Sequence, residues 1–240
     1  MADSMYGKGL AKYYDLIYSG KDYEKEAGYL KDMILKNEKS NGMSLLEVAC
    51  GTGRHLEYLE NDFKCIGLDL DKEMLKIARK RLRKTRLIQG DMIDLHLNQK
   101  FDIIICMFSS IGYLKTYGKL EKALNNFSRH LNKGGVVIIQ PWLTKRAYKI
   151  GRPSMQVYDS EDIKIARLNV SMAKGNISIL EMHHLIAERG KPVKNIVSRE
   201  ELGMFETPVF LNMMERAGFN AKFIDKKPWE LRGILIGIKR

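Results

Sequence analysis

The sequence predicts an α/β fold in which helices cover both faces of a mostly parallel sheet, with an antiparallel β insertion after the fifth strand. Short, nearly continuous apolar runs alternate with amphipathic helical segments up to Pro141, as in parallel strands buried on both faces. After Pro141 apolar residues recur with period two, which is typical of antiparallel strands. We expect an α/β core with N-terminal helices at 1–141, the insertion at 142–206, and a last helix with two core strands at 207–240.

The elements of the core follow from its periodicity. The segment 10–35 has the pattern of two amphipathic helices, broken near Gly20, that pack onto the strand ends. Helical periodicity follows the first strand at 55–59 and the second at 74–82, and a longer helix is expected at 118–131. The five apolar runs predict strands at 44–50, 63–70, 86–89, 101–106 and 136–140.

The insertion and the C-terminal region have other signals. Alternation predicts strands at 163–172 and 177–186, joined by the turn Lys174-Gly175-Asn176, and a third strand at 193–204. We expect three or four strands in total, in a region that contacts the substrate or a second copy of the chain. A helix follows from Pro208, with Gly218 as its C-cap, and the last two strands are expected at 221–224 and 231–238.

The charge of the chain points to an anionic partner or to a solvated basic surface. Lys and Arg number 41 against 29 Asp and Glu, a formal net charge of +12. Much of this excess lies in segment 72–86, where the basic residues alternate with the apolar face of the predicted helix. We therefore place it on the outer face of that helix, away from the strand ends. The charge is then a weak argument for nucleic acid, which we do not expect as a partner.

Composition excludes several other classes. No apolar run approaches the ~18–20 residues that cross a bilayer, so we expect no membrane segment. Each of the three cysteines lies within an apolar run, which is typical of buried, reduced thiols. We expect a cytoplasmic protein without a disulfide framework and without a metal.

The most specific local sequence feature is the predicted turn between the first strand and the helix after it. Small residues at Ala49, Gly51 and Gly53 let a ligand approach backbone N–H groups at a helix N-terminus. Asp69 ends the second strand, where a carboxylate can accept hydrogen bonds from both ribose hydroxyls. Leu56 stands where a dinucleotide-binding motif has its third glycine, and no phosphate-binding loop motif is present. A nucleoside site is predicted, without a pyrophosphate cradle.

These motifs resemble those of the class I S-adenosylmethionine-dependent methyltransferases. Four runs carry the resemblance in the expected order: Glu47-Val-Ala-Cys-Gly-Thr-Gly53, Gly67-Leu-Asp-Leu-Asp71, Gly90-Asp91-Met92, and Leu131-Asn-Lys-Gly-Gly-Val-Val-Ile-Ile139. The resemblance implies a Rossmann-like sheet of seven strands with S-adenosyl-L-methionine as cofactor and S-adenosyl-L-homocysteine as product. It also implies the cofactor-binding residues Tyr23, Ala49, Gly51, Asp69, Leu70, Met74, Asp91, Met92 and Met107.

Two of these expectations have simpler alternatives. Met92 could be a core residue, and Asp91 could serve only its turn. Asp71 has the position of a helix N-cap rather than that of a ligand.

Further runs resemble the sugar N,N-dimethyltransferases of macrolide biosynthesis, which act on thymidine-diphosphate-linked amino sugars. They are Tyr14-Asp-Leu-Ile17, Gly20-Lys-Asp-Tyr23, Cys106-Met-Phe-Ser-Ser-Ile-Gly112, Pro141-Trp142 and Arg232-Gly233. Tyr113 replaces the histidine that those enzymes have after Ser-Ser-Ile-Gly, and residues between Trp142 and about Leu180 match less well. The resemblance implies a small amine as the methyl acceptor.

Methyl transfer from a sulfonium needs a neutral amine and an aligned nitrogen, methyl group and sulfur, rather than a strong acid. The candidate catalytic residues are Tyr14, Tyr113 and His183, and the candidate acceptor-binding residues are Trp142 and Arg232. His183 and His184 are neighbours on a predicted strand and must face opposite sides. By likeness to the family's strand, His183 is expected to face inward.

Two other functions stay open at this point. An RNA or protein methyltransferase would use the basic surface, although Cys106-Met-Phe-Ser109 stands where base-amine methyltransferases carry Asn/Asp-Pro-Pro-Tyr/Phe. The other is a non-catalytic S-adenosylmethionine-binding protein. A homodimer is also open, since the insertion could supply its contacts.

Overall fold

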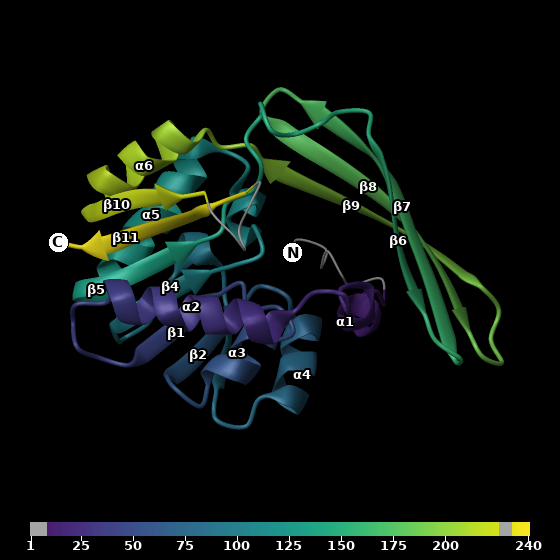
Figure 1. Cartoon of the computed structure of the whole chain (residues 1–240), viewed down its shortest axis with the longest axis horizontal. Helices are drawn as coiled ribbons and strands as arrows, with labels where there is room; N and C mark the ends of the chain where they lie inside the picture. Colours follow the sequence, from purple (N-terminus) through teal and green to yellow (C-terminus); the bar gives the residue numbers. More distant parts are fainter. Residues whose placement is uncertain (1–8, 226–231) are drawn as a thin grey trace.

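The computed structural model describes residues 9–225 and 232–240, and it contains two separate sheets (Figure 1). The larger sheet has seven strands in the order β10-β11-β5-β4-β1-β2-β3. Neighbours among the first five strands are parallel, and β11 pairs with β5 and β10 in antiparallel orientation. The strands are β1 (Ser44–Val48), β2 (Lys64–Asp69), β3 (Arg86–Gln89), β4 (Phe101–Cys106), β5 (Leu131–Ile139), β10 (Phe219–Ile224) and β11 (Ile234–Lys239). The predicted fold class is confirmed.

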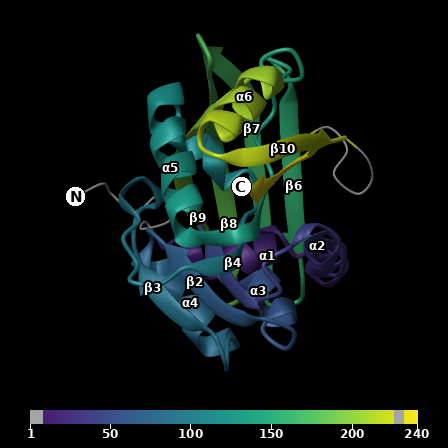
Figure 2. The same ribbon diagram turned by 90° about the vertical axis from the view of Figure 1, so that its left-hand side faces the viewer.

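Helices cover both faces of this sheet (Figure 2). Asp22 and Asp71 cap the N-termini of α2 and α4 with their carboxylates, so Asp71 is indeed an N-cap. Gly218, at φ +94°, follows the end of α6 as expected. The helices are α1 (Tyr14–Ile17), α2 (Tyr23–Asn37), α3 (Arg54–Leu59), α4 (Lys72–Arg81), α5 (Tyr117–His130) and α6 (Thr207–Arg216), with short 3-10 helices η1 (Ala11–Tyr13), η2 (Met92–Asp94) and η3 (Ser110–Leu114).

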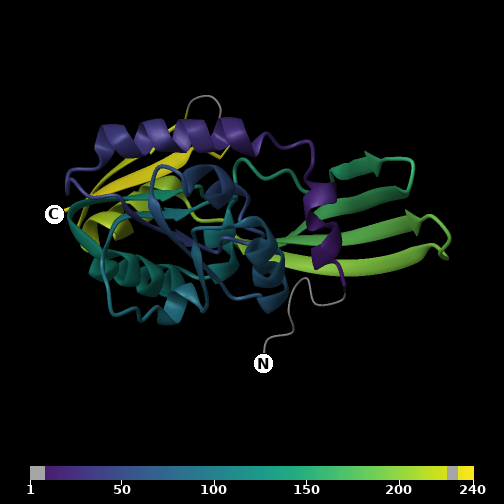
Figure 3. The same cartoon turned by 90° about the horizontal axis from the view of Figure 1, so that it is seen from below.

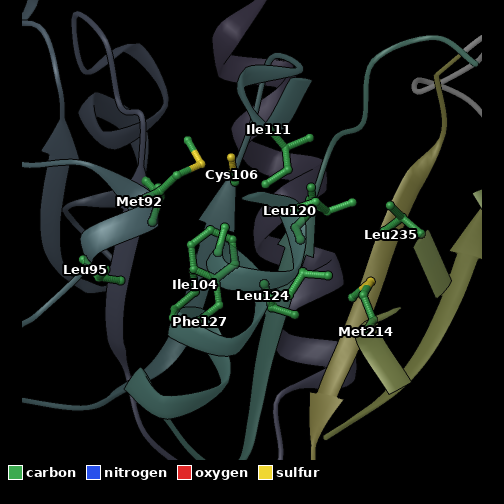
Figure 4. Packing of buried hydrophobic residues seen from close by; sticks show 14 of the residues in the cluster. Met92, Leu95, Ile104, Cys106, Ile111, Leu120, Leu124, Phe127, Met214 and Leu235 are labelled. Carbon is green, nitrogen blue, oxygen red and sulfur yellow. The ribbon is translucent and has the colours of Figure 1, made fainter. Parts of the chain in front are cut away.

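The core lies in two layers, one on each face of the sheet. Along β4, Ile103 and Ile105 face a cluster with α2, α3 and α4, whereas Ile104 faces a cluster with α5 and α6. Figure 4 shows Ile104 beside Leu124 and Phe127 in the second of these layers. Because successive strand residues alternate between two buried faces, the parallel strands are apolar throughout.

The insertion forms the smaller sheet, which projects from the core (Figures 1 and 3). It consists of four antiparallel strands in sequential order, and it stands between β5 and α6 as predicted. One face, called here the inner face, packs Ile165 and Ile186 against Leu10, Tyr13 and Ile17 near α1. The strands are β6 (Pro153–Asp159), β7 (Ile163–Lys174), β8 (Ile177–Glu188) and β9 (Lys194–Gly203).

Two details differ from the sequence expectation. Strand β5 begins at Leu131 rather than at residue 136, because its pairing with β4 shifts register and passes through Gly134 and Gly135. A Cβ at Gly135 would lie 2.8 Å from the Asp102 carbonyl oxygen, so only glycine fits there. Strand β11 begins at Ile234, later than expected, and residue 231 lies outside the described residues.

No helix of the described part of the chain is long and apolar enough to cross a membrane.

Asp102 joins three strands at the end of the sheet where β1 and β4 begin. Its carboxylate accepts hydrogen bonds from Ser44 N (3.1 Å), Ser44 Oγ (2.6 Å), Ser40 Oγ (2.7 Å) and Asn132 Nδ2 (2.8 Å). Burial alone would raise the pKa of Asp102, but these hydrogen bonds outweigh it and lower the pKa to about 2. A carboxyl group with a depressed pKa stabilises the fold above its unfolded value of 3.8, and that contribution is lost as the pH falls toward 2.

We predict that Asp102→Asn lowers the free energy of unfolding at neutral pH by about 2 kcal/mol, since an amide cannot accept from all four donors. Urea unfolding measures the change, and the difference between variant and wild type should shrink as the pH falls below about 4. Cofactor affinity should be unchanged, because Asp102 lies at the opposite end of the sheet from the candidate site. An equal destabilisation at acidic and neutral pH would contradict this account.

Candidate active site

The turn after β1 has an unusual backbone. Ala49, Gly51 and Gly53 have φ angles of +56°, +56° and +76°, in the left-handed region that favours glycine. A Cβ placed on Gly51 would meet no atom within 4 Å, so the space beside this residue is open. Left-handed alanine costs free energy and is found mostly where the surroundings enforce it. The turn is therefore a constrained, open loop at the strand ends, which suits close approach of a ligand.

Asp69 lies beside this turn at the end of β2. Its Oδ2 accepts a hydrogen bond from Gly51 N (2.7 Å), and its Oδ1 accepts one from Asp71 N (2.8 Å). Burial raises the pKa of Asp69 to about 6, although the two N–H donors act in the opposite direction. Each carboxylate oxygen keeps a further lone pair, so two hydroxyl groups could donate to it. Leu70, next in sequence, is 58% exposed, which leaves an apolar surface beside the acid.

A pocket extends from the turn toward the N-terminal helices. It brings together the predicted residues Tyr14, Tyr23, Ala49, Gly51 and Met107. Its other lining residues are Glu47, Cys50, Thr52, Arg54, His55, Phe108 and Ser110.

Glu47 is one of the pocket residues that our sequence analysis did not select as a cofactor ligand. Its side chain is almost completely buried, and Oε2 has no hydrogen-bond partner among the described residues. A buried, unpaired carboxylate oxygen is costly unless a cation or a donor reaches it. The signal available in the sequence was a single acid inside an otherwise apolar strand.

The other predicted cofactor residues lie outside the lining of this pocket. Asp91 accepts a hydrogen bond from Ile93 N (2.9 Å) and caps η2, which agrees with the alternative that Asp91 serves its turn. Met92 belongs to the core cluster of α5 and α6, and Met74 is 2% exposed on α4. Contact of these three residues with a cofactor stays a prediction.

Aromatic rings from two segments meet next to the pocket. The Tyr18 ring lies 4.7 Å from that of Tyr14 and 5.0 Å from that of Phe108, between centroids. Arg167, from the inner face of the insertion, donates from Nη1 to the Tyr18 hydroxyl (2.8 Å). Phe108 and Ser109 both have positive φ angles, which makes the loop after β4 a second constrained turn. The core and the insertion thus meet at this aromatic cluster.

Trp142 and Arg232, both predicted from sequence, are in contact. The guanidinium carbon lies 4.8 Å from the Trp142 ring centroid, and Nη1 donates to Ser109 Oγ (3.3 Å). Trp142 Nε1 donates to Ser178 Oγ (2.8 Å) on β8, which orients the indole. Burial lowers the pKa of Arg232, yet a guanidinium stays charged in proteins.

The expected orientation of the two histidines is wrong. His183 is on the outer face of the insertion, with a side chain 53% exposed and Nε2 3.6 Å from a Glu181 carboxylate oxygen. His184 faces inward, is 1% exposed, and places Nδ1 3.2 Å from the Ile196 carbonyl oxygen. The register with β7 causes this, because it pairs His184 with inner-face Arg167. In this chain His183 does not face the pocket, and Tyr113 lies half-buried in η3 without lining it.

Arg81 is partly buried, although we expected the cations of α4 to lie on its solvated outer face. Its guanidinium pairs with Asp15 (2.6 Å) and Glu57 (3.1 Å) and donates to the Thr52 carbonyl oxygen. Asp15 in turn accepts from Thr52 Oγ1 (2.7 Å). Arg81 therefore ties the turn after β1 to α1, which carries Tyr14. The other cations of segment 72–86 are exposed as predicted, namely Lys72, Lys76, Arg79, Lys80, Arg83, Lys84 and Arg86.

Comparison with known proteins identifies the family. A methyltransferase domain model matches residues 45–135. The dTDP-3-amino-3,4,6-trideoxy-α-D-glucopyranose N,N-dimethyltransferase of Streptomyces venezuelae is 37% identical over 237 residues, which cover 98% of this chain and 99% of that enzyme. The chain belongs to the sugar N,N-dimethyltransferase family of S-adenosylmethionine-dependent methyltransferases.

Solved structures agree with this assignment. The crystal structure of Streptomyces venezuelae DesVI superimposes with a TM-score of 0.90 at 36% identity, covering 96% of this chain and 98% of DesVI. CalS10, an amino pentose methyltransferase from Micromonospora echinaspora solved with S-adenosylmethionine bound, gives a TM-score of 0.86 at 28% identity over 95% of this methyltransferase and 96% of CalS10. The chain is therefore a methyltransferase, and S-adenosylmethionine is its cofactor.

The pocket of this methyltransferase and the adjoining end of β2 contain groups that suit that cofactor. Asp69 could accept from the ribose hydroxyls, and the exposed Leu70 could pack on the adenine ring. The unpaired Oε2 of Glu47 suits the ammonium group of the methionine portion. When bound, the cofactor supplies the electrophilic methyl group, and the protein supplies its binding and orientation.

We predict that affinity for S-adenosylhomocysteine falls as the pH drops through about 6, by up to about tenfold per pH unit for one coupled proton. The reason is that protonation removes acceptor capacity from Asp69, which the ribose hydroxyls require. Titration calorimetry between about pH 5 and about pH 8 measures the effect. Asp69→Ala should lose measurable binding throughout this range. Unchanged wild-type affinity from neutral to acidic pH would exclude Asp69 as the ribose acceptor.

Proposed function

We propose that the enzyme N-methylates an amino sugar carried on a nucleoside diphosphate. The observation that carries this proposal is the placement of Arg232, which stacks on Trp142 and reaches Ser109 next to the cofactor pocket. A planar guanidinium held in this way suits bidentate recognition of a phosphate group. Relatives that are named dTDP-amino sugar N,N-dimethyltransferases, at 37% and 32% identity, support the same acceptor class.

The reaction is a direct in-line displacement. The amine lone pair forms the new N–C bond while the C–S bond breaks, and the sulfur keeps the bonding electrons. The leaving group starts as a cation and leaves as a neutral thioether, so no acid is needed to expel it. Holding nitrogen, methyl and sulfur in line is the main contribution of the protein, and such alignment can supply ~7–11 kcal/mol.

Two tyrosines are the candidates to handle the amine. Tyr14 lines the cofactor pocket and stacks near Tyr18, so its hydroxyl could hold the acceptor nitrogen. Tyr113, half-buried in η3, stands in the loop that starts at Ser109. The proton lost by the methylated amine would then leave through one of these hydroxyl groups or to solvent. His183 has no such role here, because it faces away from the pocket.

We predict that Arg232→Met raises KM for a thymidine-diphosphate amino sugar about 10–100-fold, the range of a lost hydrogen bond to a charged group, with a smaller effect on kcat. The assay follows S-adenosylhomocysteine release with a panel of such sugars, the same sugars without nucleotide, and tRNA. Arg216→Met is the matched control, because Arg216, at the end of α6, forms an exposed ion pair with Glu121 of α5. Turnover with the free sugars as good as with the linked sugars, or turnover with tRNA alone, would contradict the proposal.

We also propose that the enzyme forms a homodimer through the outer face of the insertion. Strand register places large exposed apolar residues of all four strands on this one face, where Met155 pairs with Leu168 and Val157 with Ala166. Exposed apolar patches of this kind usually mark association sites. A second copy suits the face, because two apolar sheet faces can pack symmetrically. The face comprises Met155, Val157, Leu168, Val170, Met172, Leu185 and Val197.

We predict that Val170→Glu converts this dimer to a monomer, because the variant buries an unpaired carboxylate at the interface. Light scattering after size-exclusion chromatography measures the molar mass. Val209→Glu, at an exposed position of α6, is the matched control, and this variant should stay dimeric. A monomeric wild type would overturn the proposal.

A further inference from the structure

A buried histidine lies between two acids in the wall of the candidate cofactor pocket. His55, in the first turn of α3, places Nδ1 3.2 Å from Glu47 Oε1 and Nε2 3.0 Å from Glu26 Oε2. Its imidazole is almost fully buried, and the Tyr23 ring packs on it with 5.2 Å between centroids. Among the described residues no group of His, Cys, Asp or Glu is arranged to hold a metal, so this cluster requires another explanation.

The contacts determine the protonation of His55. An ionised carboxylate accepts hydrogen bonds and cannot donate, so each ring nitrogen must carry a proton to bond its partner. Burial alone would lower the pKa of His55, but the hydrogen bonds with Glu26 and Glu47 outweigh it and raise the pKa. His55 is therefore an imidazolium whose two N–H groups point at two fixed carboxylates.

The consequence for Glu47 is that its two oxygens have different surroundings. Oε1 is held by His55, whereas Oε2 is buried without a partner in the described structure, in a side chain that lines the pocket. A carboxylate that is hydrogen-bonded at one oxygen cannot rotate freely, so its other oxygen points in one fixed direction. The structure assigns His55 as a positioning residue that holds Glu47 for the ammonium group of the cofactor's methionine portion.

Glu26 and Lys21 complete this arrangement. Lys21 forms an ion pair with the same Glu26 oxygen that faces His55, and its ammonium lies 4.9 Å from the Phe108 ring centroid. The negative charges of Glu26 and Glu47 are thus balanced by the positive charges of His55 and Lys21 before the cofactor binds. Buried ion pairs of this kind add little net stability, so stability alone does not account for the cluster.

The test uses binding, which separates it from the identity of the acceptor. We expect His55→Gln to weaken binding of S-adenosylhomocysteine about 10–100-fold in calorimetry, because the uncharged amide has both N–H donors on one nitrogen and cannot span the two carboxylates as the imidazolium does. Binding of 5′-methylthioadenosine, which lacks the amino acid portion, should change less than about twofold. His96→Gln, at an exposed position, should alter neither ligand.

A double-mutant cycle with Glu47→Gln distinguishes positioning from an independent role. If His55 acts through Glu47, His55→Gln should add almost no further loss in the Glu47→Gln background. The double variant also removes the unpaired buried acid, which keeps the test usable if the single variant is unstable. Equal weakening of both ligands, or additive losses in the cycle, would overturn the proposal and leave His55 a structural residue.

Discussion

The site depends on the left-handed turn that follows β1. In the proposed site its open backbone gives the cofactor access to the strand ends, and its Gly51 amide donates a hydrogen bond to one oxygen of Asp69. The same turn is tied through the Thr52 carbonyl and hydroxyl to Arg81 and Asp15. Because Asp15 adjoins Tyr14, a single turn sets the relative position of the cofactor pocket and the helix that carries the acceptor candidate. Methyl transfer needs this alignment more than it needs any acid or base.

The insertion completes the acceptor side from a separate sheet. Its inner face brings Arg167 to Tyr18, and its Ser178 orients Trp142 against Arg232. Neither sheet alone contains this constellation, because Tyr18 and Arg232 come from the two ends of the chain. In the proposed function the parallel core holds the methyl donor, while the junction between the two sheets holds the acceptor. Variation in the insertion can then change the acceptor without changing the cofactor site.

The fold could be predicted largely from sequence, because apolar periodicity is a local signal. Strands β3 and β4 coincide with their predicted bounds, and the position of the insertion is as expected. The orientation of His183 was not predictable, because alternation alone leaves open which of the two faces of a strand meets the core. The contact of Arg81 depends on Asp15, 66 residues away in sequence, and the surroundings of Glu47 depend on His55, which also contacts Glu26, 29 residues from it. Long-range pairing of single charges leaves no periodic pattern.

The net charge of the whole chain does not reveal the carboxylates of the candidate site. The formal net charge is +12, yet two of the groups that we propose as cofactor ligands are the carboxylates of Glu47 and Asp69. These suit a ligand that carries an ammonium and a sulfonium. On the proposed acceptor side the nearby groups are cationic, because Arg232 and Arg167 lie at the junction of the two sheets. Adjacent subsites of opposite sign would orient a cationic methyl donor and an anionic sugar nucleotide with their reacting ends together, a specificity that the net charge alone cannot provide.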